Sequence, residues 1–223
     1  MGSFGGNIVT ETFSQQIYNF LRDAILRGDY RCGDIINAKS VSQECGVSIM
    51  PVREALKHLE QTGLIEIKPR SMCVVKTPSK KTIVSAIQIR ELLEVFCVEQ
   101  IYSSVSLDQL SKLKEYNNNM SSILAEKKED MGDFTFYDWK FHCELCNILD
   151  NEFINAFYPE LYIKVNMSTM YEIGTEDICY QDFVKEHNDL IHALECHSKE
   201  AVSIIKQHLK NSQNNILKGK LFS

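Results

Sequence analysis

Apolar residues recur at helical spacing along almost all of the C-terminal two-thirds of this 223-residue chain. Pro occurs only 4 times and Gly 10 times, and so few chain breakers favour long regular elements over a fold of many short strands. A helix with one apolar stripe buries that stripe against other helices. The pattern therefore predicts an all-α antiparallel bundle of about six helices, over Ile83–Ser104, Leu107–Glu126, Asp133–Leu149, Glu152–Met170, Tyr180–Cys196 and Ser198–Leu217.

The N-terminal third of the chain has a different order of elements. Three stretches have the caps and apolar spacing of helices, and two short alternating runs, separated by a turn, have the pattern of strands. Helix, helix, turn, helix and a two-stranded hairpin make a winged helix. We expect the helices over Thr10–Arg27, Ala38–Cys45 and 48–62, and the strands over Leu64–Lys68 and Cys73–Val75.

A polar linker separates these two parts. The segment Thr77–Lys81 reads TPSKK and contains a Pro, which is typical of a connection between domains. We therefore expect a mostly α protein with two domains. Residues 1–77 form the winged helix-turn-helix with its small β hairpin, and residues 78–223 form the helical bundle.

Charge is divided unequally at this linker. The whole chain has 24 Lys and Arg against 30 Asp and Glu, a net charge of −6, which by itself argues against nucleic acid as a partner. Residues 1–77, however, contain 9 basic and 8 acidic residues, and residues 78–223 contain the remaining 15 and 22. The acidity belongs to the bundle, so the net charge is compatible with DNA binding by the first domain.

The eight Cys residues are scattered rather than arranged as a disulfide framework. Cys97 and Cys196 sit inside apolar patterns, and Cys143 with Cys146 forms a C-x-x-C in which we favour packing over redox or metal chemistry. Residues 1–10 lack the basic start and apolar core of a signal peptide, and no stretch is apolar enough to cross a membrane. The expected location is the cytoplasm, where thiols stay reduced.

The recognition-helix region carries a specific motif. Gly46–Leu56 reads GVSIMPVREAL and closely resembles the GVS-x-x-PVREAL core of GntR-type bacterial transcription regulators. The similarity continues through LEQTGLIEIKPR at 59–70, and the helix around 17–28 resembles the first helix of the same domain. The resemblance implies a DNA-binding winged helix whose third helix enters the major groove.

Carried over residue by residue, this resemblance implies four DNA-binding positions. Arg53 corresponds to the arginine of the recognition helix, and Ser48 to the helix start, where a hydroxyl and nearby N–H groups can hold a phosphate. Lys39 in the second helix and Arg70 at the wing are the other two. The alternative for each cation is an ordinary surface charge or salt bridge.

Two positions depart from the family pattern. Ile49 stands where an Arg often follows the Gly-Val-Ser, and Ser71-Met72 stand near the wing tip, where Gly is common. Loss of a guanidinium at the groove removes a bidentate base contact worth about 1–3 kcal/mol of discrimination. The operator sequence or the affinity is therefore expected to differ from those common in the family.

Four residues of the bundle suggest a metal site. Asp138 and His142 are four apart, so they share one helix face, and His187 and His208 lie on the last two helices. In this order they resemble the FCD ligand-binding domain, in which the matching Asp and three His bind a divalent metal. Three imidazoles and a carboxylate suit Zn²⁺ best, with Ni²⁺, Mn²⁺ or Fe²⁺ as alternatives. Taken singly, each His is more commonly a surface or hydrogen-bonded residue.

The opening helix of the bundle also resembles that of FCD domains, whose arginine at the place of Arg90 often reaches into the cavity. A guanidinium beside a metal would bind a small carboxylate effector; the alternative is a surface pair of Arg90 with Glu94 at i,i+4. For Trp139 and the aromatic residues of Tyr158–Tyr171 we favour core packing over lining a pocket. His192 and His197 are expected to be exposed.

These patterns together predict a transcription regulator and not an enzyme. Its partners would be double-stranded operator DNA and a small carboxylate, and it would act as a homodimer, because helix-turn-helix proteins read two half-sites. The alternatives are a metal-dependent enzyme that activates water at the Asp/His₃ site and a sensor for which the metal itself is the signal. Against the enzyme, no glutamate is placed as in the H-E-x-x-H general base.

Overall fold

A computed structural model describes residues 11–69, 72–126, 131–172 and 179–217 of the chain. The winged helix begins with α1 (Phe13–Arg27), β1 (Ile35–Ile36), α2 (Ala38–Glu44) and α3 (Ile49–Gln61), and ends with β2 (Ile65–Lys68) and β3 (Met72–Val75). The bundle consists of α4 (Lys80–Ile101), α5 (Leu107–Ala125), α6 (Gly132–Asn147), α7 (Glu152–Glu172), α8 (Tyr180–Glu195) and α9 (Glu200–Leu217). The mostly α fold, the winged helix and the six bundle helices are confirmed.

Local sequence explains where the helices of the winged-helix domain begin and end. The Thr12 side chain caps α1, and Gly28 ends that helix with a φ of 82°, a left-handed conformation that costs least at Gly. Asn37 caps α2 in the same way as Thr12 caps α1. Ser48 is the N-cap residue of α3, as predicted, but its side chain makes no capping hydrogen bond.

The small sheet has three strands, not the two of the expected hairpin. Its order is β1-β3-β2, with both pairs antiparallel and Ile35 opposite Val74 in the added pair. β1 has only two residues, too short for any alternating pattern to be recognised in the sequence. It extends the sheet on the side of β3 away from β2.

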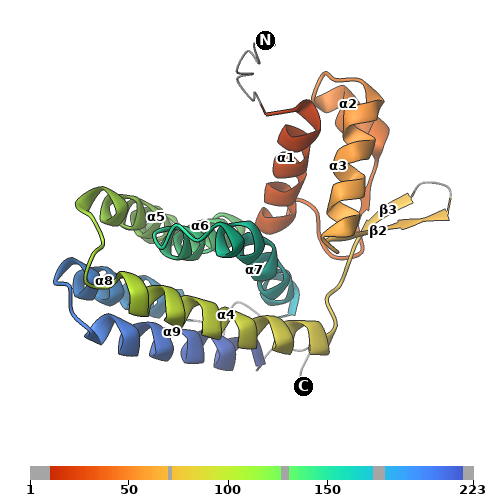
Figure 1. The fold of residues 1–223 in the computed structure, drawn as a ribbon. Helices are drawn as coiled ribbons and strands as arrows, with labels where there is room; N and C mark the ends of the chain where they lie inside the picture. Colours follow the sequence, from red (N-terminus) through yellow and green to blue (C-terminus); the bar gives the residue numbers. More distant parts are fainter. Residues whose placement is uncertain (1–10, 70–71, 127–130, 173–178, 218–223) are drawn as a thin grey trace, which may run out of the picture.

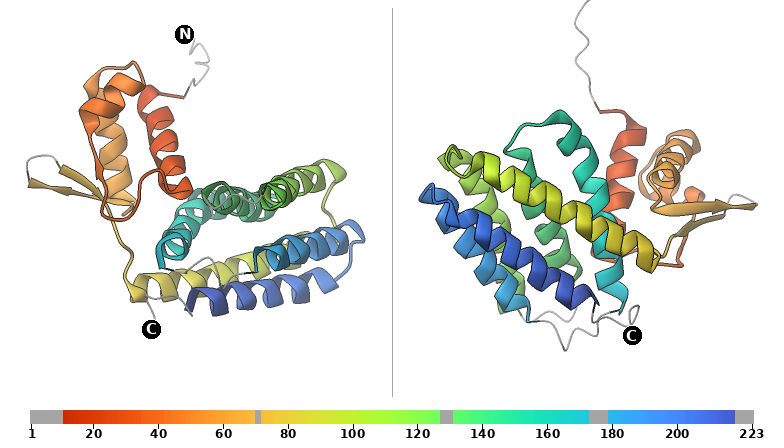
Figure 2. Two further views of the ribbon diagram at one scale, coloured as in Figure 1. Left: turned by 180° about the vertical axis from the view of Figure 1, so that it is seen from behind. Right: turned by 60° about the horizontal axis from the view of Figure 1, so that its bottom comes forward.

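The bundle has two layers, with α5, α6 and α7 in one and α4, α8 and α9 in the other (Figures 1 and 2). The winged helix stands on the first layer, where the C-terminal end of α1 meets α6 and α7 (Figure 1). One cluster of buried apolar side chains runs from α1 and α3 into α4, α6 and α7. The two parts therefore share a continuous core.

All eight Cys residues are free. Cys97 and Cys146 are buried, as expected for packing residues, but Cys196 is exposed because it lies at the end of α8. In the part of the chain that the structure describes, no helix is long and apolar enough to cross a membrane.

Candidate functional site

Three of the predicted metal ligands meet at the centre of the bundle. His142 of α6, His187 of α8 and His208 of α9 are buried, with exposed fractions of 0%, 0% and 2%. Their Nε2 atoms lie 3.2, 3.3 and 3.4 Å from one another. Asp138, one turn before His142, places Oδ1 3.8 Å from His142 Nε2 and 3.7 Å from His187 Nε2. The structure thus brings the four residues together.

Two carboxylates determine which nitrogens face the centre. Glu94 of α4 lies 2.7 Å from His142 Nδ1, and Glu186 of α8 lies 2.7 Å from His208 Nδ1. The imidazoles of His142 and His208 therefore donate Nδ1–H to these carboxylates, and their Nε2 lone pairs point inward. Carboxylate–histidine pairs of this kind orient the imidazoles of metal sites.

Burial favours the neutral form of two of the imidazoles, those of His142 and His187. The pKa of His187 is held well below its ordinary value of 6.5, first by burial and then by its neighbours His208 and His142. The pKa of His142 is also lowered, mainly by burial, although the adjacent Glu94 opposes the shift. Neutral imidazole is the form that binds a metal.

The donor set fits a divalent metal. Nitrogen ligands about 2.0–2.1 Å from a tetrahedral Zn²⁺ lie about 3.3–3.4 Å apart, close to the spacing of the three Nε2 atoms. With two of the three rings donating through Nδ1, the cluster has too few protons for three mutual hydrogen bonds, and a cation would relieve the lone-pair repulsion. Asp138 Oδ1 is buried without a hydrogen-bond partner among the described residues, while Tyr162 donates to the other carboxylate oxygen.

Glu94 connects the histidine cluster to Arg90. Its Oε1 accepts hydrogen bonds from Arg90 Nε and from the Tyr158 hydroxyl, both at 2.5 Å. Burial alone would raise the pKa of Glu94, but Arg90, His142 and Tyr158 together hold that pKa well below 4.5. The carboxylate is therefore ionised while its exposed fraction is 0%.

Sequence reasoning missed four members of this network: Glu94, Glu186, Tyr158 and Tyr162. The i,i+4 spacing of Arg90 and Glu94 suggests a surface ion pair, whereas the structure buries the pair, with side-chain exposures of 4% and 0%. Glu186 pairs with His208, which is 22 positions away on the next helix, so no local sequence pattern indicates its role. Tyr158 and Tyr162 are in the core, as predicted, but they also hydrogen-bond to site carboxylates.

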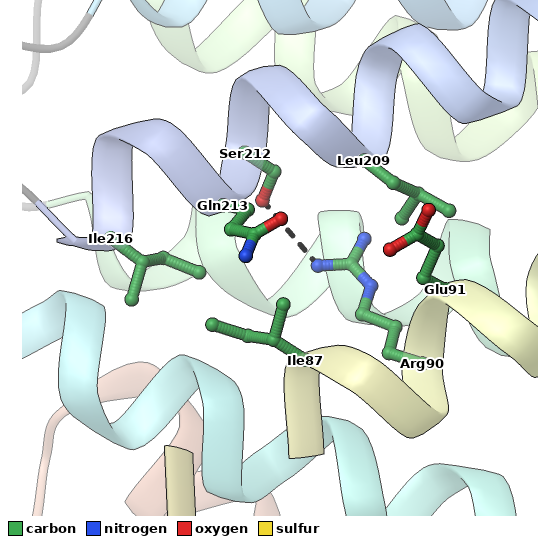
Figure 3. A pocket seen from close by; sticks show the side chains of 7 residues that line it. All are labelled: Ile87, Arg90, Glu91, Leu209, Ser212, Gln213 and Ile216. Carbon is green, nitrogen blue, oxygen red and sulfur yellow. Dashed lines mark hydrogen bonds between the residues drawn. The ribbon is translucent and has the colours of Figure 1, made fainter. Parts of the chain in front are cut away.

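The Arg90 guanidinium points between α4 and α9 (Figure 3). Its Nη1 lies 3.5 Å from Ser212 Oγ, its Cζ lies 4.1 Å from the centre of the Tyr162 ring, and its Nη2 has no partner among the described residues. The cavity beside it, lined by Ile87, Leu209 and other residues shown in Figure 3, has a volume of about 10 Å³. That is room for about one water molecule.

The predicted DNA-binding residues within the described chain are exposed. Lys39 lies in the first turn of α2, Ser48 is the N-cap residue of α3, and Arg53 lies in the first half of α3. Arg53 forms no ion pair with any described residue, so the salt-bridge alternative has no support in this part of the chain. Arg70 lies outside the described residues. Ile49, at the departure from the family pattern, is 37% exposed.

Helix α6 carries two of the four predicted metal ligands, Asp138 and His142, and also contacts the winged helix. A Cβ at Gly132 would lie 1.9 Å from the backbone oxygen of Arg27, so the start of α6 packs directly against the end of α1. Arg27 Nε also lies 3.3 Å from Asp133 Oδ1, and Arg27 Cζ lies 4.0 Å from the centre of the Phe136 ring. Asp138 and His142 are about two and three turns further along this helix from Gly132.

A winged helix with an exposed recognition helix, joined to a helical bundle, defines the class of winged-helix DNA-binding transcription regulators. Comparisons with known proteins specify the family. A model of the bacterial regulatory proteins of the gntR family matches residues 13–75, and a model of the FCD domain matches residues 85–211. This chain therefore belongs to the GntR family, in the group whose second domain is an FCD domain.

Relatives agree with this assignment. The HTH-type transcriptional repressor RspR of Escherichia coli (strain K12) is 27% identical over 209 residues, which cover 93% of this chain and 90% of that protein. The gluconate operon transcriptional repressor of Bacillus subtilis (strain 168) is 30% identical over 142 residues, 63% of this chain and 57% of that protein. Such relatives are repressors, and the prediction of a DNA-binding regulator rather than an enzyme is confirmed.

A solved structure supports the fold. Escherichia coli McbR/YncC superimposes with a TM-score of 0.82 at 18% sequence identity, over 94% of this chain and 99% of that chain. At this level of identity the similarity concerns the fold alone.

Proposed function

We propose that this regulator binds operator DNA as a homodimer and that a divalent metal and a small carboxylate, held in the bundle, modulate that binding. Residues 1–77 would read the DNA through Lys39, Ser48, Arg53 and Arg70. Residues 78–223 would bind the metal through Asp138, His142, His187 and His208, and the effector through Arg90. The site of action would be the cytoplasm, where operator DNA is found.

The observation that carries the regulatory part is the double role of α6. It contributes Asp138 and His142 to the histidine cluster, and its first residue, Gly132, packs against the Arg27 backbone of α1. A ligand that draws the bundle helices together at the histidine cluster would act on α6, the helix against which the winged helix packs. Such coupling requires the ligand to prefer one arrangement of the two domains.

The metal would supply a positive charge at the cluster, held by His142, His187, His208 and Asp138. The residues of this chain do the remaining work. Glu94 and Glu186 fix the orientation of His142 and His208, and Tyr162 orients Asp138. Zn²⁺ is the ion that this donor set and spacing favour, with Ni²⁺, Mn²⁺ and Fe²⁺ as alternatives.

A carboxylate effector is supported by the Nη2 of Arg90, which has no partner among the described residues, because a buried guanidinium N–H without an acceptor is costly. A carboxylate would have to displace Ser212 or Glu94 from Arg90, since the adjoining cavity of about 10 Å³ is too small for it. This lack of room favours the alternative that the metal alone is the signal. Metal titration with and without a panel of organic acids separates the two.

The proposed homodimer has a candidate contact surface on α4. Ile89, Leu92 and Phe96 are 40%, 67% and 46% exposed and follow one another at intervals of three and four residues. They form one stripe on the outer face of the helix. Exposed apolar stripes of this kind are typical of protein–protein contacts.

Gel retardation of DNA from the protein's own promoter region tests the DNA-binding part of the proposal. At low salt we expect specific retardation by the wild type and by Lys210→Ala, a change at an exposed cation of α9, but much weaker retardation by Arg53→Ala. Equal retardation by all three proteins would mean that Arg53 does not read the operator. Equal retardation of operator DNA and random DNA by the wild type would mean that the protein does not recognise a DNA sequence.

A further inference from the structure

A second, larger cleft lies where the winged helix meets the bundle. It has a volume of about 310 Å³, within the range of small-molecule sites. Arg22 of α1 forms one side, Tyr116 of α5 another, and residues of α6 and α7 form the rest. It is distinct from the histidine cluster, although Trp139, Lys140 and Cys143 in its wall alternate along α6 with the metal-site positions.

Among the described residues, the charges around the cleft leave one cation, Lys140, without an ion-pair partner. Arg22 is paired with Asp23 at 2.8 Å, and Glu144 in the wall is paired with Lys112 at 3.2 Å. Lys140 is half-buried and forms no ion pair with any described residue. Its Nζ is instead 5.2 Å from the centre of the Trp139 ring and 5.3 Å from that of Phe136. The cleft therefore has an unpaired positive charge, suited to a single anionic group.

The remaining walls are aromatic and apolar. Tyr116, Trp139 and Tyr158 contribute rings, and Ile154 and Pro159 contribute aliphatic surface. The Arg22 guanidinium lies 5.0 Å from the centre of the Trp139 ring, so both cations of the cleft flank this indole. Surfaces of this kind accept a flat apolar body whose charged end lies beside the cations.

The α7 side of the cleft has a hydrogen-bond acceptor that no described residue satisfies. Asn155 Oδ1 is buried and has no hydrogen-bond partner among the described residues. Pro159, four residues later, has no N–H to donate to the Asn155 carbonyl within the helix. A ligand with a hydroxyl at the end opposite its anionic group would satisfy an acceptor here.

We propose that this cleft binds an aromatic monocarboxylate, with the carboxylate at Lys140 and Arg22 and a hydroxyl near Asn155. The site differs from the one at Arg90 and does not need the metal. Because Arg22 belongs to α1 and the other wall residues belong to the bundle, the bound acid would contact both domains at once.

The fluorescence of Trp139 provides a direct test, because it is the only Trp in the chain. The probes are 4-hydroxybenzoate and its neutral analogue 4-hydroxybenzamide, titrated into the full-length protein with excitation that avoids tyrosine. We expect saturable quenching by the acid and at least about tenfold weaker binding of the amide, because it cannot make the charge-assisted contact.

Variants locate the site. Lys140→Gln should weaken binding of 4-hydroxybenzoate by at least about tenfold, and Arg22→Gln should weaken it as well. Lys210→Gln, the same change at an exposed position of α9, should leave it unchanged. Undiminished affinity in both Lys140→Gln and Arg22→Gln would overturn the proposal, as would equal binding of acid and amide or the absence of saturation at millimolar acid.

Discussion

The residues with proposed functions have opposite surroundings in the two domains. In the winged helix, the side chains of Arg53 and Ser48 are exposed, Arg53 forms no ion pair with a described residue, and Ser48 makes no capping hydrogen bond. In the bundle, His187 and Glu94 are fully buried, and Glu94 hydrogen-bonds to three other side chains. A substitution of such a residue in the winged helix should therefore change DNA binding without changing stability. A substitution of such a residue in the bundle should change both ligand binding and stability.

Glu94→Gln should have the largest effect on stability. It would leave the buried Arg90 charge without its ion-pair partner, and breaking a buried pair in this way costs about 3–5 kcal/mol of unfolding free energy. Urea denaturation measures the loss. The control is Glu91→Gln, an exposed glutamate on the same helix, which should stay within about 0.5 kcal/mol of the wild type. If the two variants were equally stable, the buried network would not be the stabilising feature described above.

His187→Ala should have the largest effect on metal binding. It removes one of the three imidazoles of the cluster, and we expect metal affinity to fall by about a hundredfold or more, since even loss of an orienting partner costs 10–100-fold. The matched control is His192→Ala, an exposed histidine on the same helix. Competition with a chromogenic chelator measures both. Similar affinities for the two variants would remove His187 from the site.

Gly132→Ala tests the contact between the two domains. At an open helical position Ala is more stable than Gly by up to about 1 kcal/mol. Here the added methyl group would lie 1.9 Å from the Arg27 backbone oxygen, so we expect a loss of about 1–3 kcal/mol instead. Thermal or urea unfolding shows whether the variant is less stable or more stable than the wild type. A stabilised variant would show that α1 does not pack on α6 in solution as described.

Arg53→Ala should show the smallest change in the free energy of unfolding and affect DNA binding only. Loss of one arginine contact to a base should weaken operator binding by about 1–3 kcal/mol, while the unfolding free energy should stay within about 0.5 kcal/mol because the side chain is exposed. Fluorescence anisotropy with operator and random DNA measures the first and urea denaturation the second. A marked loss of stability would break the comparison between the domains.

The sequence predicted the elements because their signals are local. Each bundle helix was expected to within about three residues of its observed ends, since the apolar period and the break residues lie in the helix itself. The four residues that meet at the cluster were expected together because Asp138 and His142 share one helix face and the order of the later histidines resembles a family pattern. The winged helix was expected from the contiguous motif at Gly46–Leu56, and the matching family model confirmed it.

Other features depend on residues far apart in the chain and leave no local pattern. Glu94 meets His142 across 48 positions and Tyr158 across 64. The close approach of Gly132 to Arg27 is likewise visible only once the helices are packed. The i,i+4 spacing of Arg90 and Glu94 does not show whether the pair is exposed or buried. In the structure the pair lies inside the protein rather than on its surface.

The central claim is that metal at the histidine cluster alters operator binding through α6. The most direct measurement is the operator dissociation constant of chelator-treated and Zn²⁺-loaded protein, for the wild type, His192→Ala and His187→Ala. We predict at least a fivefold difference between the two metal states in the wild type and in His192→Ala, the lower end of allosteric coupling, and no difference in His187→Ala. Equal dissociation constants for metal-free and metal-loaded wild-type protein would contradict the claim.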